Sequence, residues 1–186
     1  MVTFQYKMRV KKAAFKEARA KGELSKQGVP IIPRTSSNAA KGAGAESVAK
    51  GINGWFLGEH LPSKLPSNHG FDGVFLKRTA NGSVEKIFIT ETKYQAAGGR
   101  PNLSKTKTKG LQMSEEWVEK NLRAMERSGD SGLEATAGLI RDNIEKVVYK
   151  ANVVTPDGIN KWYTLKPTKD GVIINPPRAP PKPHPK

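Results

Sequence analysis

Two apolar runs separated by a short polar break dominate the middle of the chain. The first covers residues 71–76, the second lies within residues 84–93, and Asn81-Gly82 falls between them. An Asn-Gly pair between two apolar runs is a strong β-hairpin signal, so we predict two antiparallel strands here. The second strand is apolar on both faces at residues 87–89, which predicts a position inside a sheet.

Apolar residues at helical spacing predict three helices around this hairpin. One precedes the hairpin and two follow it, separated by a Ser- and Gly-rich turn over residues 128–132. A basic, alanine-rich segment over residues 10–21 predicts a further helix, which Gly22 would end. The three central helices are predicted over residues 42–58, 111–127 and 133–144. The apolar stripe of the first is formed by Val48, Ile52, Trp55 and Phe56.

Three short apolar segments after the helices predict further strands. They cover residues 147–154, 162–165 and 172–174, and Asp-Gly pairs at 157–158 and 170–171 predict the turns between them. Together with the hairpin, these segments predict an α/β domain in which a central mixed β-sheet is flanked by helices.

Prolines mark both ends of this domain. Pro30 and Pro33 lie in a loop that closes an N-terminal segment over residues 1–41, and six prolines crowd residues 176–186. Because proline breaks helices and favours extended chain, we expect a basic helical segment with its linker, a folded domain over residues 42–175 and a disordered tail. The N-terminal helix would either grip phosphates or join the domain to something larger.

The net charge of the chain limits the kinds of molecule that it is expected to bind. The 186 residues include 32 Lys and Arg against 17 Asp and Glu, a net charge of +15. Such an excess attracts polyanions, of which nucleic acid fits best, with an anionic membrane surface or no specific partner as alternatives. The absence of cysteine excludes disulfides and thiolate metal sites. No apolar run reaches the roughly 18 residues of a membrane span, and the N-terminus does not read as a signal peptide.

Charged residues at one end of the predicted hairpin form the candidate site. Asp72 begins the first strand, and Glu91 and Lys93 end the second, so all three should meet at the same end. Glu91 and Lys93 are two residues apart and therefore point to one face. Two carboxylates can hold a divalent metal ion, and a lysine beside them can orient a water or stabilise negative charge. This pattern favours phosphodiester hydrolysis, whereas the alternative is a surface ion pair on a plain hairpin.

The order of Asp72, a hairpin and Glu91-Thr92-Lys93 resembles the PD-(D/E)XK nuclease superfamily. It is most similar to the restriction-endonuclease-like toxin domains at the C-termini of bacterial polymorphic toxins, of the Rhs and contact-dependent-inhibition type. The similarity includes Gln-Met-Ser-Glu-Glu-Trp at residues 112–117 and covers residues 42–125. The resemblance implies a restriction-endonuclease-like core, with Mg²⁺ or Mn²⁺ bound by Asp72, Glu91 and the Thr92 carbonyl, and a catalytic Lys93.

The resemblance also implies roles for two more residues. Glu46 would complete the acidic cluster, and Gln112 would hydrogen-bond the lysine or a metal-bound water. Glu59 is the alternative to Glu46 as the residue that completes the acidic cluster, because it falls on the apolar stripe of the helix if the helix extends that far. The two glutamates point to roughly opposite sides of the helix, so only one of them can serve. His69, three residues before Asp72, would bind phosphate or shuttle a proton, or be an ordinary loop histidine.

A basic, glycine-containing loop follows the second strand. Its cations could contact phosphates on either side of a scissile bond, unless the loop is simply solvated. They are Arg100, Lys105, Lys107 and Lys109. Trp117, in the helix that follows, is expected in the core rather than stacked on a base.

The residues favour a metal-dependent nuclease, and the resemblance implies an endonuclease that acts as an antibacterial toxin. DNA is the first expected substrate and transfer RNA the second. The resemblance further implies delivery by a secretion machine into the cytoplasm of a target bacterium, and an acidic immunity protein that blocks the site. Two alternatives stay open: a non-enzymatic basic module that binds nucleic acid, and a housekeeping repair or restriction nuclease.

Overall fold

The computed structural model describes residues 37–66, 69–156 and 160–175. The predicted N-terminal helix, the Asp-Gly turn at 157–158 and the proline-rich tail lie outside these ranges. Within them, none of the helices is both long and apolar enough to cross a membrane.

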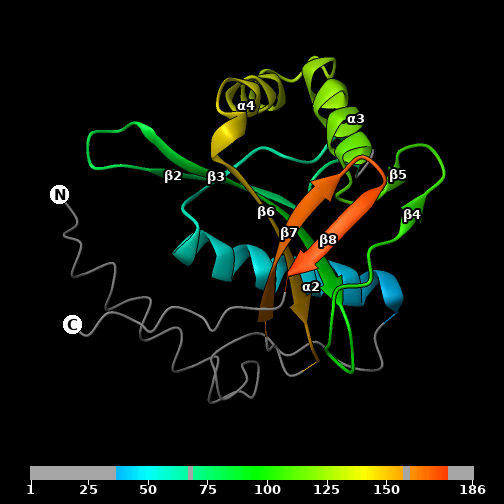
Figure 1. Cartoon of the computed structure of the whole chain (residues 1–186). Coiled ribbons are helices and arrows are strands. Elements are labelled where there is room, and N and C mark those ends of the chain that lie inside the picture. Colours follow the sequence, from blue (N-terminus) through cyan, green and yellow to red (C-terminus); the bar gives the residue numbers. More distant parts are fainter. Residues whose placement is uncertain (1–36, 67–68, 157–159, 176–186) are drawn as a thin grey trace, which may run out of the picture.

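A six-stranded sheet forms the centre of the described chain, in the order β1-β2-β3-β6-β7-β8 (Figure 1). Its strands are β1 (Glu59–Leu61), β2 (Gly73–Arg78), β3 (Val84–Tyr94), β6 (Val147–Val154), β7 (Asn160–Thr168) and β8 (Gly171–Asn175). β3 and β6 run parallel, and all other neighbours in this sheet are antiparallel. The sheet is therefore mixed, and β3 lies inside it as its apolar pattern predicts.

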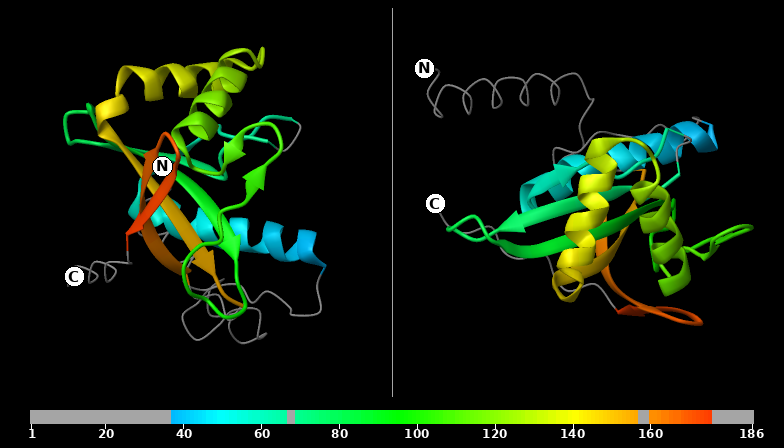
Figure 2. Two further views of the ribbon diagram at one scale, coloured as in Figure 1. Left: turned by 45° about the vertical axis from the view of Figure 1, so that its right-hand side comes forward. Right: turned by 90° about the horizontal axis from the view of Figure 1, so that it is seen from above.

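Helices cover both faces of the sheet, as Figures 1 and 2 show. One face carries α2 (Asn38–Phe56), and the other carries α3 (Glu115–Glu126) and α4 (Ser131–Asp142). A parallel pair of strands needs a long crossover, and α3 and α4 lie in the connection from β3 to β6. A 3₁₀ turn at Ile144–Lys146 leads into β6. The predicted class, an α/β domain with a central mixed sheet flanked by helices, is confirmed.

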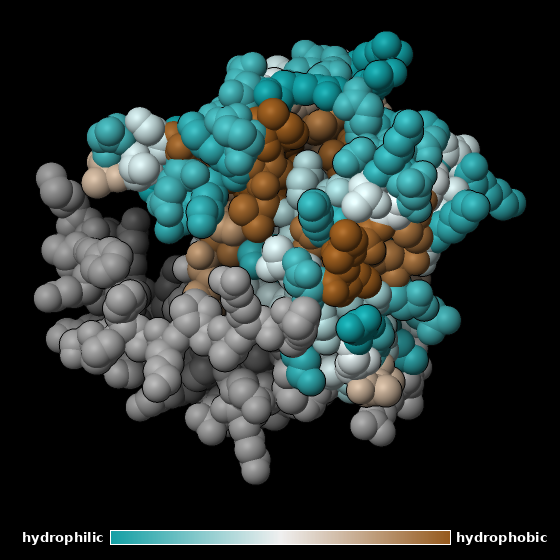
Figure 3. Space-filling view, in the orientation of Figure 1, coloured by the Kyte–Doolittle hydropathy of each residue, from teal (hydrophilic) through white to brown (hydrophobic). Residues whose placement is uncertain are grey.

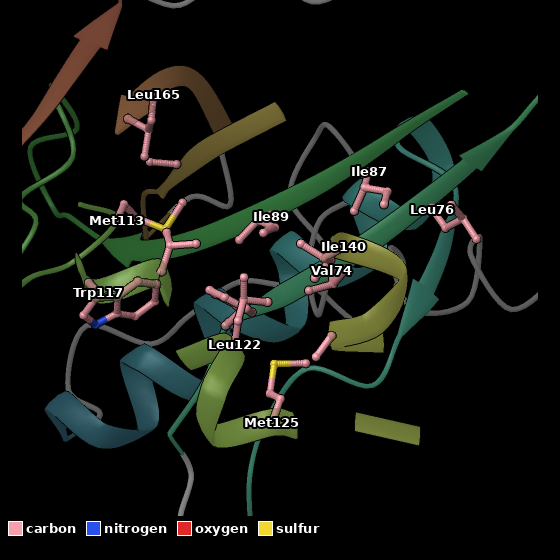
Figure 4. Packing of buried hydrophobic residues seen from close by; sticks show 14 of the residues in the cluster. Val74, Leu76, Ile87, Ile89, Met113, Trp117, Leu122, Met125, Ile140 and Leu165 are labelled. Carbon is pink, nitrogen blue, oxygen red and sulfur yellow. The ribbon is translucent and has the colours of Figure 1, made fainter. Parts of the chain in front are cut away.

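The main hydrophobic core lies between the sheet and the layer of α3 and α4 (Figure 4). Side chains alternate along β3, so Ile87 and Ile89 enter this core while Phe88 packs in a separate cluster on the other side. Trp117 is buried and packs against Phe71, with ring centroids 5.5 Å apart. The prediction that Trp117 belongs to the core is confirmed.

The helix α2 begins earlier than the sequence predicts. Its first residues fall in the predicted loop, because Ser37 caps the helix by accepting a hydrogen bond from the amide of Ala40 at 3.2 Å. The predicted apolar stripe is wrong at Phe56, which is 51% exposed and makes a T-shaped ring contact with Trp162. The helix ends at Phe56, and Leu57 just beyond it fills the buried position instead.

Two segments that the sequence does not predict as strands form short strands. Residues 59–61 form β1, which pairs with β2 at the edge of the sheet. The basic loop after β3 includes a small hairpin of β4 (Lys105–Thr106) and β5 (Gly110–Leu111). Because this hairpin takes the start of the predicted second helix, α3 begins only at Glu115.

Hydrophilic side chains surround areas of hydrophobic atoms on the face shown in Figure 3. Among the described residues, the large hydrophobic side chains most open to solvent are Phe56, Ile144 and Ile173. They come from the end of α2, the 3₁₀ turn and the edge strand β8, so they do not belong to one element.

Candidate active site

The β2–β3 hairpin brings Asp72 beside the end of β3. Gly73 lies opposite Thr90 in the ladder, so Asp72 faces the residues that follow Thr90. The backbone N–H of Thr92 donates a hydrogen bond to Asp72 Oδ2 at 2.7 Å. No side chain fits at Gly73, because a Cβ there would lie 2.8 Å from Thr90 Oγ1. The β2–β3 pairing and the hydrogen bond from Thr92 therefore fix Asp72 next to Glu91 and Lys93.

Glu91 is held by two polar side chains. Its Oε1 pairs with Lys93 Nζ at 2.9 Å and accepts a hydrogen bond from Gln112 Nε2 at 2.8 Å. Lys93 Nζ also donates to Gln112 Oε1 at 2.6 Å, which closes a triangle of three side chains. The amide of Ser104 donates to the same Gln112 oxygen at 2.9 Å and ties the loop before β4 to the site. The three groups thus hold one another at fixed separations.

Gln112 lies in the turn between β5 and α3, and not in a helix as the prediction for residues 111–127 had it. Met113, the next residue, has a positive φ of 65°, which is unusual for a residue other than glycine, and its side chain is fully buried. Ser114 then caps α3 by accepting a hydrogen bond from the amide of Trp117 at 3.3 Å. The turn thus anchors Met113 in the core, and the preceding residue Gln112 reaches Glu91.

Lys64, which is not among the predicted site residues, joins the cluster. Lys64 Nζ is hydrogen-bonded to Glu46 Oε2 and lies 3.3 Å from Asp72 Oδ1. Glu46 comes from α2, whereas Lys64 follows β1, so the pair joins two separate elements. A single lysine in a proline-containing loop gives no local signal, and only the fold reveals its position.

Burial and neighbouring charges shift the proton affinities in the cluster. Burial raises the pKa of Glu91 to about 8, the charge of Asp72 adds to the rise, and Lys93 opposes it. Burial disfavours the charged form of Lys64, but Glu46 and Asp72 outweigh this effect and raise its pKa above the usual value. Added positive charge near Glu91 would favour its ionised form.

Two other sequence candidates are exposed to solvent. Glu59 is exposed on β1 opposite Leu76, away from the Gly73 end of β2. Since α2 ends before it, Glu59 does not continue the stripe of that helix. His69 is exposed, and its carbonyl accepts a hydrogen bond from the Leu65 amide at 2.8 Å. The structure therefore brings Glu46 and not Glu59 to Asp72.

The basic residues of the loop after β3 divide into two kinds. Lys109 is partly buried, and its Nζ donates a hydrogen bond to Asn121 Oδ1 on α3 at 2.6 Å. Burial lowers the pKa of Lys109. Lys120 fastens the same hairpin by donating to the Thr108 carbonyl at 2.9 Å. Lys109 therefore anchors the hairpin, and the side chains left open to a polyanion are Arg100, Lys105 and Lys107.

The donor atoms decide which metal ion would suit the cluster. In the described part of the chain, no three His, Cys, Asp or Glu side chains are arranged as a ready-made metal site. Lys64 and Lys93 lie against the carboxylates instead. Oxygen donors suit Mg²⁺ and Mn²⁺, and Mg²⁺ commonly uses only one or two carboxylates together with water and substrate phosphates. Asp72, Glu91 and the Thr92 carbonyl therefore have the right chemistry for such an ion.

Comparisons with protein-family models, curated proteins and solved structures gave no significant match. The function is therefore proposed from the geometry and chemistry of the cluster together with the resemblance seen in the sequence.

Proposed function

We propose that this chain is a metal-dependent nuclease of the PD-(D/E)XK type, which hydrolyses phosphodiester bonds at Asp72, Glu91 and Lys93. The observation that carries the proposal is the burial of Glu91, only 3% exposed, beside Asp72 and in contact with Lys93. Burying ionisable groups is costly, and such clusters gather at functional sites. A mixed sheet with helices on both faces is compatible with a restriction-endonuclease-like core.

Each residue of the cluster has a distinct part in the proposed reaction. Asp72, Glu91 and the Thr92 carbonyl would hold Mg²⁺ or Mn²⁺, which supplies positive charge for the scissile phosphate and a more acidic water. Lys93 orients the attacking water or stabilises the negative charge that grows on the phosphate. Gln112 fixes the separation between Lys93 and Glu91. Glu46 adds a carboxylate at the edge of the cluster, next to Asp72.

Charge supports a nucleic acid as the substrate. The net charge is +15, and Arg100, Lys105 and Lys107 are exposed in the segment that Gln112 joins to the cluster. Phosphate contacts of this kind give affinity without sequence information. DNA is the favoured substrate and transfer RNA the second. The biological role would be that of an antibacterial toxin domain, delivered into a target bacterium and blocked by an acidic immunity protein.

Incubation of the chain with plasmid DNA and with total RNA tests the proposal. We expect cleavage with Mg²⁺ or Mn²⁺, none with EDTA, and loss of cleavage in Lys93→Met. Lys86→Met is the matched control, because Lys86 is an exposed lysine of the same strand and should leave cleavage unchanged. Binding of nucleic acid without cleavage under any of these conditions would instead identify a non-enzymatic basic module.

Expression in a bacterium without an inhibitor separates a toxin from a housekeeping nuclease. We expect the wild-type chain to stop growth and Asp72→Ala to be tolerated at the same protein level. Normal growth with an active wild-type enzyme would remove the toxin role and leave the nuclease chemistry in place.

A further inference from the structure

The ammonium group of Lys64 occupies a place between two carboxylates of the candidate active site. It is hydrogen-bonded to Glu46 and lies 3.3 Å from Asp72 Oδ1. The Asp72 side chain is 13% exposed and that of Lys64 27%, so this ion pair is more shielded from water than an ordinary surface pair. The other oxygen of Asp72 is taken by the Thr92 amide. Lys64 therefore faces the Asp72 oxygen that remains for a metal ion.

The loop that carries Lys64 is held in place by the backbone. Lys64 forms an isolated β-bridge with Gly70, and the amide of Phe71 donates to the Ser63 carbonyl at 3.0 Å. Gly70 has a φ of 117°, and a Cβ there would lie 2.4 Å from the Ser63 carbonyl oxygen, so the close approach requires glycine. The same pairing leads directly into Asp72. The backbone of Lys64 is thus fixed by pairing with residues 69–71, and its ammonium is held by the two carboxylates.

We propose that Lys64 is an internal cation of the acidic site, which holds Glu46 and Asp72 together in the metal-free protein and must be displaced when a divalent ion binds Asp72. This inference rests on the proposed nuclease function. Two carboxylates that share one ammonium repel each other less, so the site is stable without a metal ion. The same contact competes with the metal ion for Asp72. Lys64 therefore raises the metal concentration at which the site fills.

Calorimetric titration of the full chain with MnCl₂ tests this role without an activity measurement. We expect Lys64→Met to bind Mn²⁺ roughly tenfold more tightly than the wild-type chain, because a competing positive charge is removed. Lys64→Arg, which keeps the charge, should bind no more tightly than the wild type. Lys77→Met is the matched control, since Lys77 pairs with Glu85 at 2.7 Å on the exposed part of the hairpin and its loss should not change Mn²⁺ affinity.

A second measurement covers the case in which Lys64→Met does not fold. In the wild-type chain, the side-chain NMR resonance of Lys64 should shift as Mg²⁺ is added, while that of Lys77 stays fixed. A Lys64 resonance that does not move while Mg²⁺ fills the site would overturn the inference, as would equal or weaker Mn²⁺ binding by Lys64→Met. If the wild-type chain binds metal and cleaves nucleic acid in those cases, the nuclease proposal survives. If neither the wild type nor Lys64→Met binds Mn²⁺ or cleaves, both proposals fail.

Discussion

The amide of Thr92 donates a 2.7 Å hydrogen bond to the carboxylate of Asp72. This bond joins the residue that precedes β2 to the part of β3 that carries Glu91 and Lys93. The relative position of the two acids therefore depends on the backbone pairing of β2 with β3 and on this bond from a backbone amide to a side chain. Changes of side-chain charge at this point should alter the chemistry of the site more than its shape.

Asp72→Asn should abolish cleavage and leave the fold intact. The asparagine keeps an oxygen that accepts the Thr92 amide, but it removes the charge that would bind a metal ion. We expect cleavage to fall by roughly a hundredfold or more, with the fold kept and only a modest fall in melting temperature from the lost ion pair with Lys64. Plasmid nicking and thermal unfolding measure the two effects. Asp170→Asn, in the exposed turn before β8, is the control and should behave as wild type, whereas nicking by Asp72→Asn at the wild-type rate would contradict the assignment.

Stability without metal should fall as the pH rises from 5 to 8. Burial, with the charge of Asp72, raises the pKa of Glu91 to about 8 in the folded state from 4.5 in the unfolded chain. The folded protein therefore holds a proton there that the unfolded chain has released. The contribution of this bound proton to the stability of the fold is fully present below about pH 4.5 and is lost as the pH rises to about 8.

Glu91→Gln removes this titration and tests the assignment. Urea unfolding in EDTA measures the free energy of unfolding at several pH values. Between pH 5 and pH 8, this free energy should rise in the variant relative to the wild type by about a few kcal/mol. Glutamine can still accept the hydrogen bonds from Lys93 and Gln112. Parallel stability curves for the two proteins would show that Glu91 is ionised in the folded state across this range.

Arg141→Gln should weaken the contact between α3 and α4. The Arg141 guanidinium binds both oxygens of Glu119, at 2.6 and 3.0 Å, and Glu126 at 2.8 Å. Because these side chains are about one-third exposed, we expect a loss of only about 1 kcal/mol in the free energy of unfolding, shrinking at high salt. Chemical denaturation at low and high salt measures it. Arg127→Gln, at an exposed position, is the control, and an equal loss in both variants would argue against the network.

Asn152→Val should stabilise the protein. The side chain of Asn152 is fully buried on β6, and within the described residues neither of its polar atoms has a hydrogen-bond partner. An unsatisfied buried group of this kind costs about 1–3 kcal/mol, and valine suits a strand. We expect a higher melting temperature, with Asn175→Val at the exposed end of β8 as a nearly neutral control. A clear loss of stability in Asn152→Val would reveal an internal water that satisfies the asparagine.

Local sequence determined the strands β2, β3 and β6 and half of the acidic site. The Asn81-Gly82 turn joins β2 and β3, and β6 covers the predicted residues 147–154. The two-residue spacing of Glu91 and Lys93 places their side chains in contact at 2.9 Å. Turn chemistry and strand alternation act over a few residues, so the sequence is sufficient to predict them.

Only the tertiary structure decided how Glu46, Lys64 and Gln112 join the acidic site. Lys64 meets Glu46 across 18 positions of sequence, because the packing of α2 on the sheet and the bridge from Lys64 to Gly70 bring them together. Gln112 reaches Glu91 from a turn that the apolar pattern had assigned to a helix. Local preferences of about a kcal/mol per residue are easily overridden by burial and by hydrogen bonds between distant segments, and neither of these is visible in the spacing of residues along the chain.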